Sequence, residues 1–154
     1  MKIYVVRHGE SLSTSPDDTR PLSEKGKDDI KRLANFIVHL NIKVNRIVHS
    51  PKYRAQETAE ILSSAISLFG TIETSAQLDP LASISHIINQ FNVWEGDSLI
   101  VGHMPFMGKL VNKLTSGDED NNVVIFKPGN IVCLELTERE RWSICWMLTP
   151  ILLK

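Results

Sequence analysis

The sequence predicts a single α/β domain of three layers, in which helices cover both faces of a mixed, mostly parallel sheet. Two observations lead to this fold class. Short β-rich runs alternate with longer segments whose apolar residues recur at helical spacing, the pattern of strands joined by crossover helices. Late in the chain, β-rich runs near 123–126, 130–136 and 142–148 follow one another without a helix, so antiparallel strands are expected there. The length of 154 residues suits one domain over 1–154.

The first elements are a strand, a loop and a helix. Residues 3–6 are apolar and β-rich, which is typical of a central strand buried on both faces. Residues 9–22 are polar and contain two prolines, and they predict a loop. Ser23 is placed to cap a helix, and apolar residues at helical spacing extend that helix over about 24–40.

A second strand and helix follow. Residues 46–49 predict the strand, and Ser50 with the proline after it predicts a helix start. An apolar stripe from Ala55 to Phe69 marks the buried face of this helix, and Gly70 is expected to end it.

The middle of the chain predicts two more units. Residues 71–76 predict a third strand, and Ser83 is placed to cap a short helix. Residues 98–101 predict another buried strand, and Pro105 opens an amphipathic helix. An acidic loop at 116–122 separates that helix from the late β-rich runs.

The composition is that of a soluble globular protein with no polyanion partner. Hydrophobic residues make up 42% of the chain, charged residues 23%, and the formal net charge is −1. Without a basic run or a basic excess, binding to nucleic acid is not expected. The first apolar run is too short for a signal peptide or a membrane span, so a cytoplasmic location without membrane association is expected. Cys133 and Cys145 lie in apolar stretches and are expected to be buried thiols.

Basic side chains gather where the predicted strands end. Arg7 and His8 directly follow the first strand, and His103 follows the strand at 98–101. Arg54 lies in the first turn of the helix after the second strand, and helical side chains lean toward the N-terminus. Ligands of open α/β sheets bind beyond the carboxyl ends of the strands, where free backbone N–H groups favour anions. These side chains therefore predict a phosphate-binding site.

Four segments near these positions occur in the order of a known family. They are Arg7-His8-Gly9-Glu10, residues 20–26 (Arg-Pro-Leu-Ser-Glu-Lys-Gly), residues 50–59 (Ser-Pro-Lys-Tyr-Arg-Ala-Gln-Glu-Thr-Ala) and residues 101–105 (Val-Gly-His-Met-Pro). With them the chain resembles the histidine phosphatase superfamily, which includes the phosphoglycerate mutases. Residues 146–150 are similar to the end of its short SixA-type members. The resemblance spans most of the chain, and it implies a phosphoglycerate mutase-like fold without a cap insertion.

The resemblance also implies roles for the site residues. His8 would attack phosphorus through a neutral ring nitrogen, while its other ring nitrogen donates to a backbone carbonyl. Arg7, Arg54 and His103 would surround the phosphoryl oxygens and stabilise the charge that develops there. Arg20 is expected either to help hold the substrate or to form a structural ion pair. Since these cations supply the positive charge, neither a metal nor a cofactor is expected.

The general acid stays open at this point. Family members that cleave phosphate esters protonate the departing alcohol with a carboxylic acid shortly after the third strand, which points to Asp79. The alternative is that Asp79 is a turn residue before Pro80, and Glu10 is a second carboxylate near the site. An imidazole leaves more easily than an alkoxide, so a phosphohistidine substrate needs less help from an acid.

The spacing of the motifs guides the choice of substrate class. Residues 80–102, between Asp79 and His103, have room for one short helix and one strand but not for a long helical cap. An uncapped pocket is open enough for a phosphorylated protein side chain. We therefore expect a monomeric phosphatase that hydrolyses phosphohistidine on a phosphotransfer-type protein through phospho-His8. Two alternatives stay open, a phosphatase for small phosphate esters and a catalytically weak member that only binds phosphorylated partners.

Overall fold

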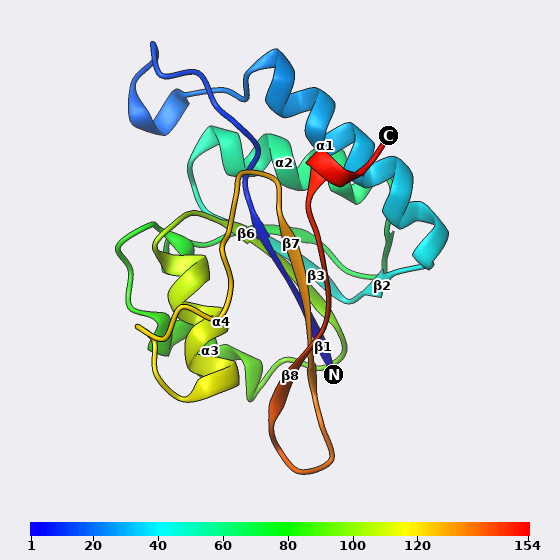
Figure 1. The fold of residues 1–154 in the computed structure, drawn as a ribbon, viewed down its shortest axis with the longest axis vertical. Helices are drawn as coiled ribbons and strands as arrows, with labels where there is room; N and C mark the ends of the chain where they lie inside the picture. The colour runs from blue at the N-terminus through cyan, green and yellow to red at the C-terminus, as the bar shows by residue number, and fades with distance from the viewer.

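A six-stranded sheet forms the middle layer of the computed structural model, which describes residues 1–154 (Figure 1). The strands lie in the order β5-β3-β6-β1-β7-β8. Their bounds are β1 (Lys2–Arg7), β3 (Arg46–His49), β5 (Ile72–Thr74), β6 (Ser98–Gly102), β7 (Ile131–Leu136) and β8 (Trp142–Leu148). β1, β3, β5 and β6 pair in parallel, whereas β7 and β8 are antiparallel additions at one side. The prediction of a mixed, mostly parallel sheet is confirmed.

Helices cover both faces of this sheet. α1 (Glu24–Ile37) and α2 (Tyr53–Ser63) lie on one face, and α3 (Ile84–Phe91) and α4 (Phe106–Ser116) lie on the other (Figure 1). Successive side chains of a strand point to opposite faces, so Tyr4 and Val6 join the core under α1 and α2, whereas Ile3 and Val5 join the core under α3 and α4. Each fully buried aliphatic side chain of these two cores stabilises the fold by roughly 1.5–3 kcal/mol.

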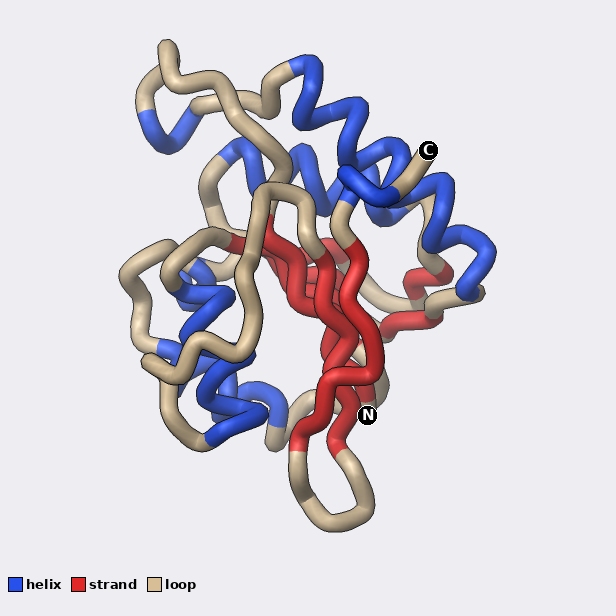
Figure 2. Tube along the Cα trace, viewed as in Figure 1, coloured by secondary structure: helices blue, strands red, loops and turns tan.

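Short elements complete the chain. β2 (Lys43–Val44) and β4 (Ser67–Leu68) form a separate two-stranded sheet. Single 3-10 turns are η1 (Asp17–Thr19), η2 (Val38–Leu40), η3 (Ala76–Leu78) and η4 (Pro150–Leu152). Long loops lie beyond the upper ends of the central strands, and the C-terminus ends beside α1 (Figure 2). None of the helices is long and apolar enough to cross a membrane.

The start of α1 follows the prediction closely. Ser23 caps the helix, since its Oγ accepts a hydrogen bond from the backbone N–H of Gly26 at 3.0 Å. The regular helix ends at Ile37, three residues before the predicted end, and η2 continues the turn to Leu40. Asn41 then adopts a left-handed conformation with φ of 51°, which ends the helical path.

The second helix is shorter than predicted at both ends. α2 begins at Tyr53, so the proline after Ser50 is not its first residue. It ends at Ser63 rather than near Gly70, because the hydroxyls of Ser63 and Ser64 donate to the carbonyls of Glu60 and Ile61 and compete with further helical hydrogen bonds. Beyond this point Ala65, Ile66 and Leu68 pack against the core, Phe69 is exposed, and the chain forms β4 instead of a helix.

Three other expectations near the sheet need correction. Residues 123–126 do not form a strand, because side-chain amides bind their backbone: Asn112 Oδ1 accepts from Val123 N, and Asn130 Nδ2 donates to the carbonyl of Ile125. The third strand is confined to Ile72–Thr74 at an edge of the sheet. Cys133 is buried as expected, but Cys145 is exposed because β8 is the opposite edge strand.

Candidate active site

The carboxyl ends of β1, β3 and β6 are aligned by hydrogen bonds that continue just beyond the strands. The His8 N–H donates to the carbonyl of Gly102 at 2.9 Å, and the Ser50 N–H donates to the carbonyl of Val101 at 3.1 Å. These two bonds place His8, Ser50 and the residue after Gly102, which is His103, along one edge of the sheet. The sequence-based expectation that the strand ends bring their polar residues together is confirmed for the two histidines, whose ring centroids lie 4.9 Å apart.

His8 is held in one tautomer by two hydrogen bonds. Its Nδ1–H donates to the carbonyl of Gly9 at 2.6 Å, a backbone acceptor of the kind that the family resemblance implies. Its Nε2 accepts a long bond of 3.4 Å from Nε of Arg54, and a nitrogen that accepts carries a lone pair rather than a proton. The imidazole is therefore neutral, with the lone pair of Nε2 turned toward the guanidinium group.

The surroundings of His8 keep its ring neutral at physiological pH. Burial and the neighbouring guanidinium groups together lower the pKa of His8 to about 4, although the hydrogen bond to the Gly9 carbonyl opposes this shift. These guanidinium groups belong to Arg54, Arg7 and Arg20. The same positive field that opposes a cationic imidazole favours a bound anion.

His103 is buried against His8 and is oriented by Ser50. Burial, together with the nearby positive charge, lowers the pKa of His103 to about 3. The Ser50 hydroxyl forms a short hydrogen bond with Nε2 of His103, and its oxygen also accepts from the Lys52 N–H at 3.4 Å. Nδ1 of His103 is buried and has no partner within the protein. A buried polar atom without a partner is costly, and a bound substrate oxygen would satisfy it.

The three arginines differ in their partners. Arg54 is buried and donates from Nη1 to the carbonyl of Asp17 at 2.6 Å and from Nη2 to Oδ1 of Asp17 at 3.0 Å. Arg7 donates from Nη1 to the carbonyl of Phe126 at 2.6 Å, and its Nε is buried without a partner. Arg20 also has a buried Nε without a partner. Neither Arg7 nor Arg20 forms an ion pair, so the structural ion pair considered for Arg20 is absent.

Two residues of α2 hold the loop 9–22 at both ends, and sequence reasoning assigned them no role. Thr58 Oγ1 accepts from the Gly9 N–H at 3.1 Å and donates to the carbonyl of Arg54 at 2.8 Å. Glu57 Oε1 accepts from the Leu22 N–H at 2.8 Å. Both lie in the motif segment 50–59, so their place in the motif was the available signal. They tie the loop that follows His8 to the helix that carries Arg54.

α1 approaches the chain after His8 closely enough to require glycine. A Cβ at Gly26 would overlap the backbone carbonyl of Glu10, and a Cβ at Gly9 would lie 2.9 Å from a carbon of Ile30 and 3.1 Å from the Gly26 carbonyl. Because backbone atoms cannot swing aside as a side chain can, a larger residue at Gly26 must push α1 and the loop apart. These glycines therefore help to fix the position of His8.

Asp79 lies beside this group rather than within it. It lines a cavity of about 420 Å³ together with Asp17 and Lys52, residues that also contact the Arg54 region. Three apolar or small residues of the turn after Asp79 form the far wall, namely Pro80, Leu81 and Ala82. The cavity is connected to the guanidinium group of Arg54 through Asp17, which lines the cavity and binds Arg54.

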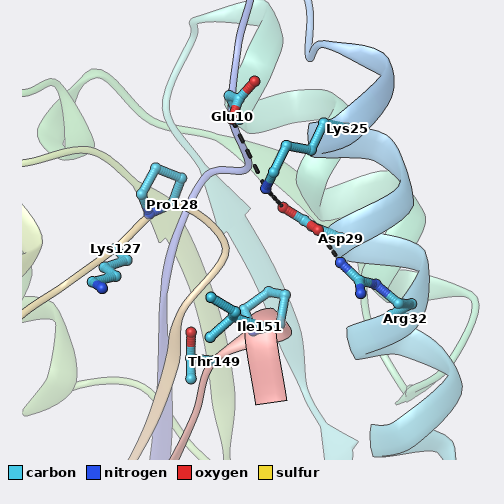
Figure 3. A pocket seen from close by; sticks show the side chains of 9 residues that line it. Glu10, Lys25, Asp29, Arg32, Lys127, Pro128, Thr149 and Ile151 are labelled. Carbon is cyan, nitrogen blue, oxygen red and sulfur yellow. Dashed lines mark hydrogen bonds and ion pairs between the residues drawn. The ribbon is translucent and has the colours of Figure 1, made fainter. Parts of the chain in front are cut away.

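Glu10 lines a different cavity. That cavity, of about 280 Å³, lies between α1, the C-terminal turn and residues 127–128. Within it Lys25 lies between Glu10 and Asp29, at 3.9 and 2.6 Å (Figure 3). None of the histidines or arginines predicted for the site lines it. No three His, Cys, Asp or Glu side chains of the protein come together as a group that could hold a metal ion.

Comparison with known proteins gives consistent similarities. The sequence model of the histidine phosphatase superfamily (branch 1) matches residues 3–81. The phosphohistidine phosphatase SixA of Escherichia coli (strain K12) is 25% identical over 159 aligned positions that cover 100% of this chain and 97% of SixA. The solved structure of the protein histidine phosphatase SixA complexed with tungstate superposes with a TM-score of 0.89, at 25% identity and full coverage of both chains. A putative α-ribazole-5′-P phosphatase from E. coli shares the fold, with a TM-score of 0.78 and 14% identity over 97% of this chain and 96% of that one.

Proposed function

The chain belongs to the histidine phosphatase superfamily, and from this premise we propose that it hydrolyses phosphohistidine on a protein through a phospho-His8 intermediate. The observation that carries the proposal is the state of His8. Its proton is held on Nδ1 by the Gly9 carbonyl, and the lone pair of Nε2 accepts a hydrogen bond from the guanidinium group of Arg54. A neutral imidazole with its lone pair beside an anion-binding group is the arrangement that in-line attack on phosphorus requires.

In the first step Nε2 of His8 attacks phosphorus, and the bond from phosphorus to the substrate imidazole breaks. If the far nitrogen of the substrate ring is protonated, that ring leaves as neutral imidazole and needs no acid from the enzyme. His8 keeps its proton on Nδ1, so the phosphorylated ring is cationic and the Gly9 carbonyl stabilises the new charge. A cationic phosphoimidazole is in turn a good leaving group for the second step.

In the second step water attacks phosphorus and the bond to Nε2 breaks. The electron pair returns to Nε2, the proton of the water goes to the released phosphate or to solvent, and His8 regains its starting tautomer. Arg7, Arg54 and His103 contact the equatorial phosphoryl oxygens, and Arg20 adds positive charge. The support for these roles is the unpartnered buried nitrogen on each of Arg7, Arg20 and His103. A bound phosphoryl group would supply acceptors for these nitrogens.

Ser50 determines which nitrogen of His103 is available. When the Ser50 hydroxyl donates to Nε2, the imidazole proton lies on Nδ1, the buried nitrogen without a partner. That N–H is then free to donate to a phosphoryl oxygen. A neutral histidine serves here because its low pKa keeps it from adding a charge that would repel the neighbouring arginines.

Two observations support the proposed substrate class, namely the open site and the relative of similar length. The segment between Asp79 and His103 holds only α3 and β6, so no helical cap covers the phosphate site. E. coli SixA, matched over 97% of its length, is a phosphohistidine phosphatase. In this proposal the protein acts as a monomer on a phosphotransfer-type protein. A cytoplasmic location stays a prediction.

A second candidate activity is the cleavage of small phosphate esters, in which Asp79 would be the general acid. Its place on the wall of the 420 Å³ cavity suits a general acid that protonates a departing alkoxide. The test compares kcat/KM for a phosphohistidine protein and for an aryl phosphate in the wild type and in Asp79→Asn. We expect the protein substrate to be preferred and the Asn variant to slow mainly ester cleavage. Rapid cleavage of esters with the phosphohistidine protein left intact would contradict the proposed substrate.

A further inference from the structure

Asp17 binds the guanidinium group of Arg54, the group proposed to hold phosphate. Nη1 of Arg54 donates to the Asp17 carbonyl at 2.6 Å, and Nη2 donates to its carboxylate at 3.0 Å. The other carboxylate oxygen of Asp17 pairs with Nζ of Lys52. With Nε of Arg54 directed at His8, all three nitrogens of the guanidinium group have partners in the free protein. The side chain of Arg54 is only 7% exposed, so little of the guanidinium group is open to solvent.

This contact imitates the way an arginine binds phosphate. A guanidinium fork grips two oxygens of a carboxylate or a phosphate in the same manner, so the two anions compete for it. A phosphoryl oxygen that reaches Arg54 must displace the Asp17 carboxylate or lie beside it. In both cases the negative charge of Asp17 weakens binding of the phosphoryl group.

Asp17 is suited to this competition rather than to proton transfer. Its hydrogen bond to Lys52 and the charge of Arg54 lower the pKa of its carboxyl group, which is therefore ionised at neutral pH. An acid that is already deprotonated cannot protonate a leaving group. The carboxylate is instead a fixed negative charge beside the phosphate site.

The loop that carries Asp17 is attached firmly at its ends and through side chains at its tip. Near the ends, Leu12 N donates to the Pro21 carbonyl at 3.0 Å, and Leu22 N donates to Glu57. The tip of the loop is η1. There Asp17 binds both Arg54 and Lys52, and Asp18 binds Lys52, so the tip is held against the start of α2. The carboxylate of Asp17 is half-exposed, so it has room to swing away from Arg54 while the ends of the loop stay in place.

We infer that Asp17 is an internal competitor for Arg54 that weakens the hold of the site on inorganic phosphate and so promotes release of the product. The inference rests on the proposed phosphate site. Asp17 lowers the affinity for any phosphoryl group, but a protein substrate has contacts outside this site that offset the loss, whereas free phosphate has none. The residue therefore favours the macromolecular substrate over the product.

The test is calorimetric titration of sodium phosphate into the wild type, Asp17→Asn and Asp18→Asn. The asparagine at 17 keeps the shape of the side chain and leaves the backbone contact to Arg54 in place, so it removes only the charge. We expect Asp17→Asn to bind phosphate about fivefold to tenfold more tightly, with a smaller ratio at high salt. Asp18 pairs only with Lys52, at 3.1 Å, so Asp18→Asn is the matched control and should bind like the wild type.

The outcomes separate this inference from the proposed function. Equal or weaker phosphate binding by Asp17→Asn overturns it, since Asp17 would then order Arg54 without competing. Equal tightening in Asp18→Asn also overturns it, because a general change in surface charge would explain the effect. Failure of all three proteins to bind phosphate contradicts the phosphate site itself. The titration needs no turnover, so a wrong choice of phosphohistidine as substrate would leave its result intact.

Discussion

Arg54 donates from Nε to Nε2 of His8 over 3.4 Å, so the guanidinium group proposed to bind phosphate also faces the lone pair proposed to attack it. This contact joins the first turn of α2 to the end of β1. It holds the nucleophilic atom and the anion-binding group in one unit before substrate arrives, which lowers the cost of orienting them during the reaction.

The pH dependence of activity should reflect the low pKa of His8. A protonated imidazole cannot attack phosphorus, so kcat/KM should fall as the pH drops through about 4, the value to which burial and the neighbouring guanidinium groups lower this pKa. Activity should persist near pH 6.5, where an ordinary imidazole is about half protonated. The profile is measured with two aryl phosphates of different acidity, so that ionisation of the substrate can be separated from that of the enzyme. An acidic limb centred near 6.5 for both substrates would contradict the account of His8.

Replacing Ser50 by alanine should weaken catalysis through His103. The variant removes the hydrogen bond to Nε2, so the ring proton is no longer confined to Nδ1 and the donor to the phosphoryl group is lost in part of the molecules. We expect kcat for an aryl phosphate to fall by about tenfold or more, with KM changed little. Ser98 is a matched control, because it is also buried, its hydroxyl has no partner, and it lies at the opposite end of β6. If Ser98→Ala lowered kcat as much as Ser50→Ala, the positioning role of Ser50 would be wrong.

Gly26→Ala should reduce both stability and activity. The added Cβ overlaps the Glu10 carbonyl, so α1 and the segment after His8 must separate. Such overpacking costs about 1–3 kcal/mol in the free energy of unfolding, and displacement of His8 should also lower kcat. Gly70→Ala provides the comparison, since its Cβ would meet the Asn45 carbonyl, which lies away from the site. Denaturant titration and aryl phosphate kinetics should show a stability loss in both variants and a loss of kcat only in Gly26→Ala.

The central strands and the main site residues could be predicted because they depend on local pattern and on one topological rule. The buried runs at 3–6, 46–49 and 98–101 all became strands of the sheet. Parallel strands bring their carboxyl ends to one edge, and this alone brings His8 close to His103. A resemblance to known motifs then identified Arg54 in its helix.

The errors and omissions arose where hydrogen bonds of polar side chains, rather than the apolar pattern, decide the outcome. The stripe of apolar residues through Phe69 continued at helical spacing, but hydroxyls of two serines ended α2 at Ser63. Residues 123–126 have strand-like composition, yet the amides of Asn112 and Asn130 bind their backbone. Asp17 had no motif to mark it, since its meaning depends on Arg54 across the loop.

Trapping of the phosphorylated enzyme tests the central claim most directly. The protein is mixed briefly with a phosphohistidine substrate that carries labelled phosphate and is quenched in alkali, which preserves phosphoramidate bonds, and the modified residue is mapped by mass spectrometry. We predict label on Nε2 of His8, its loss in acid, and neither label nor turnover in His8→Ala. Label on another residue, or undiminished turnover by His8→Ala, would contradict the claim that His8 is the nucleophile.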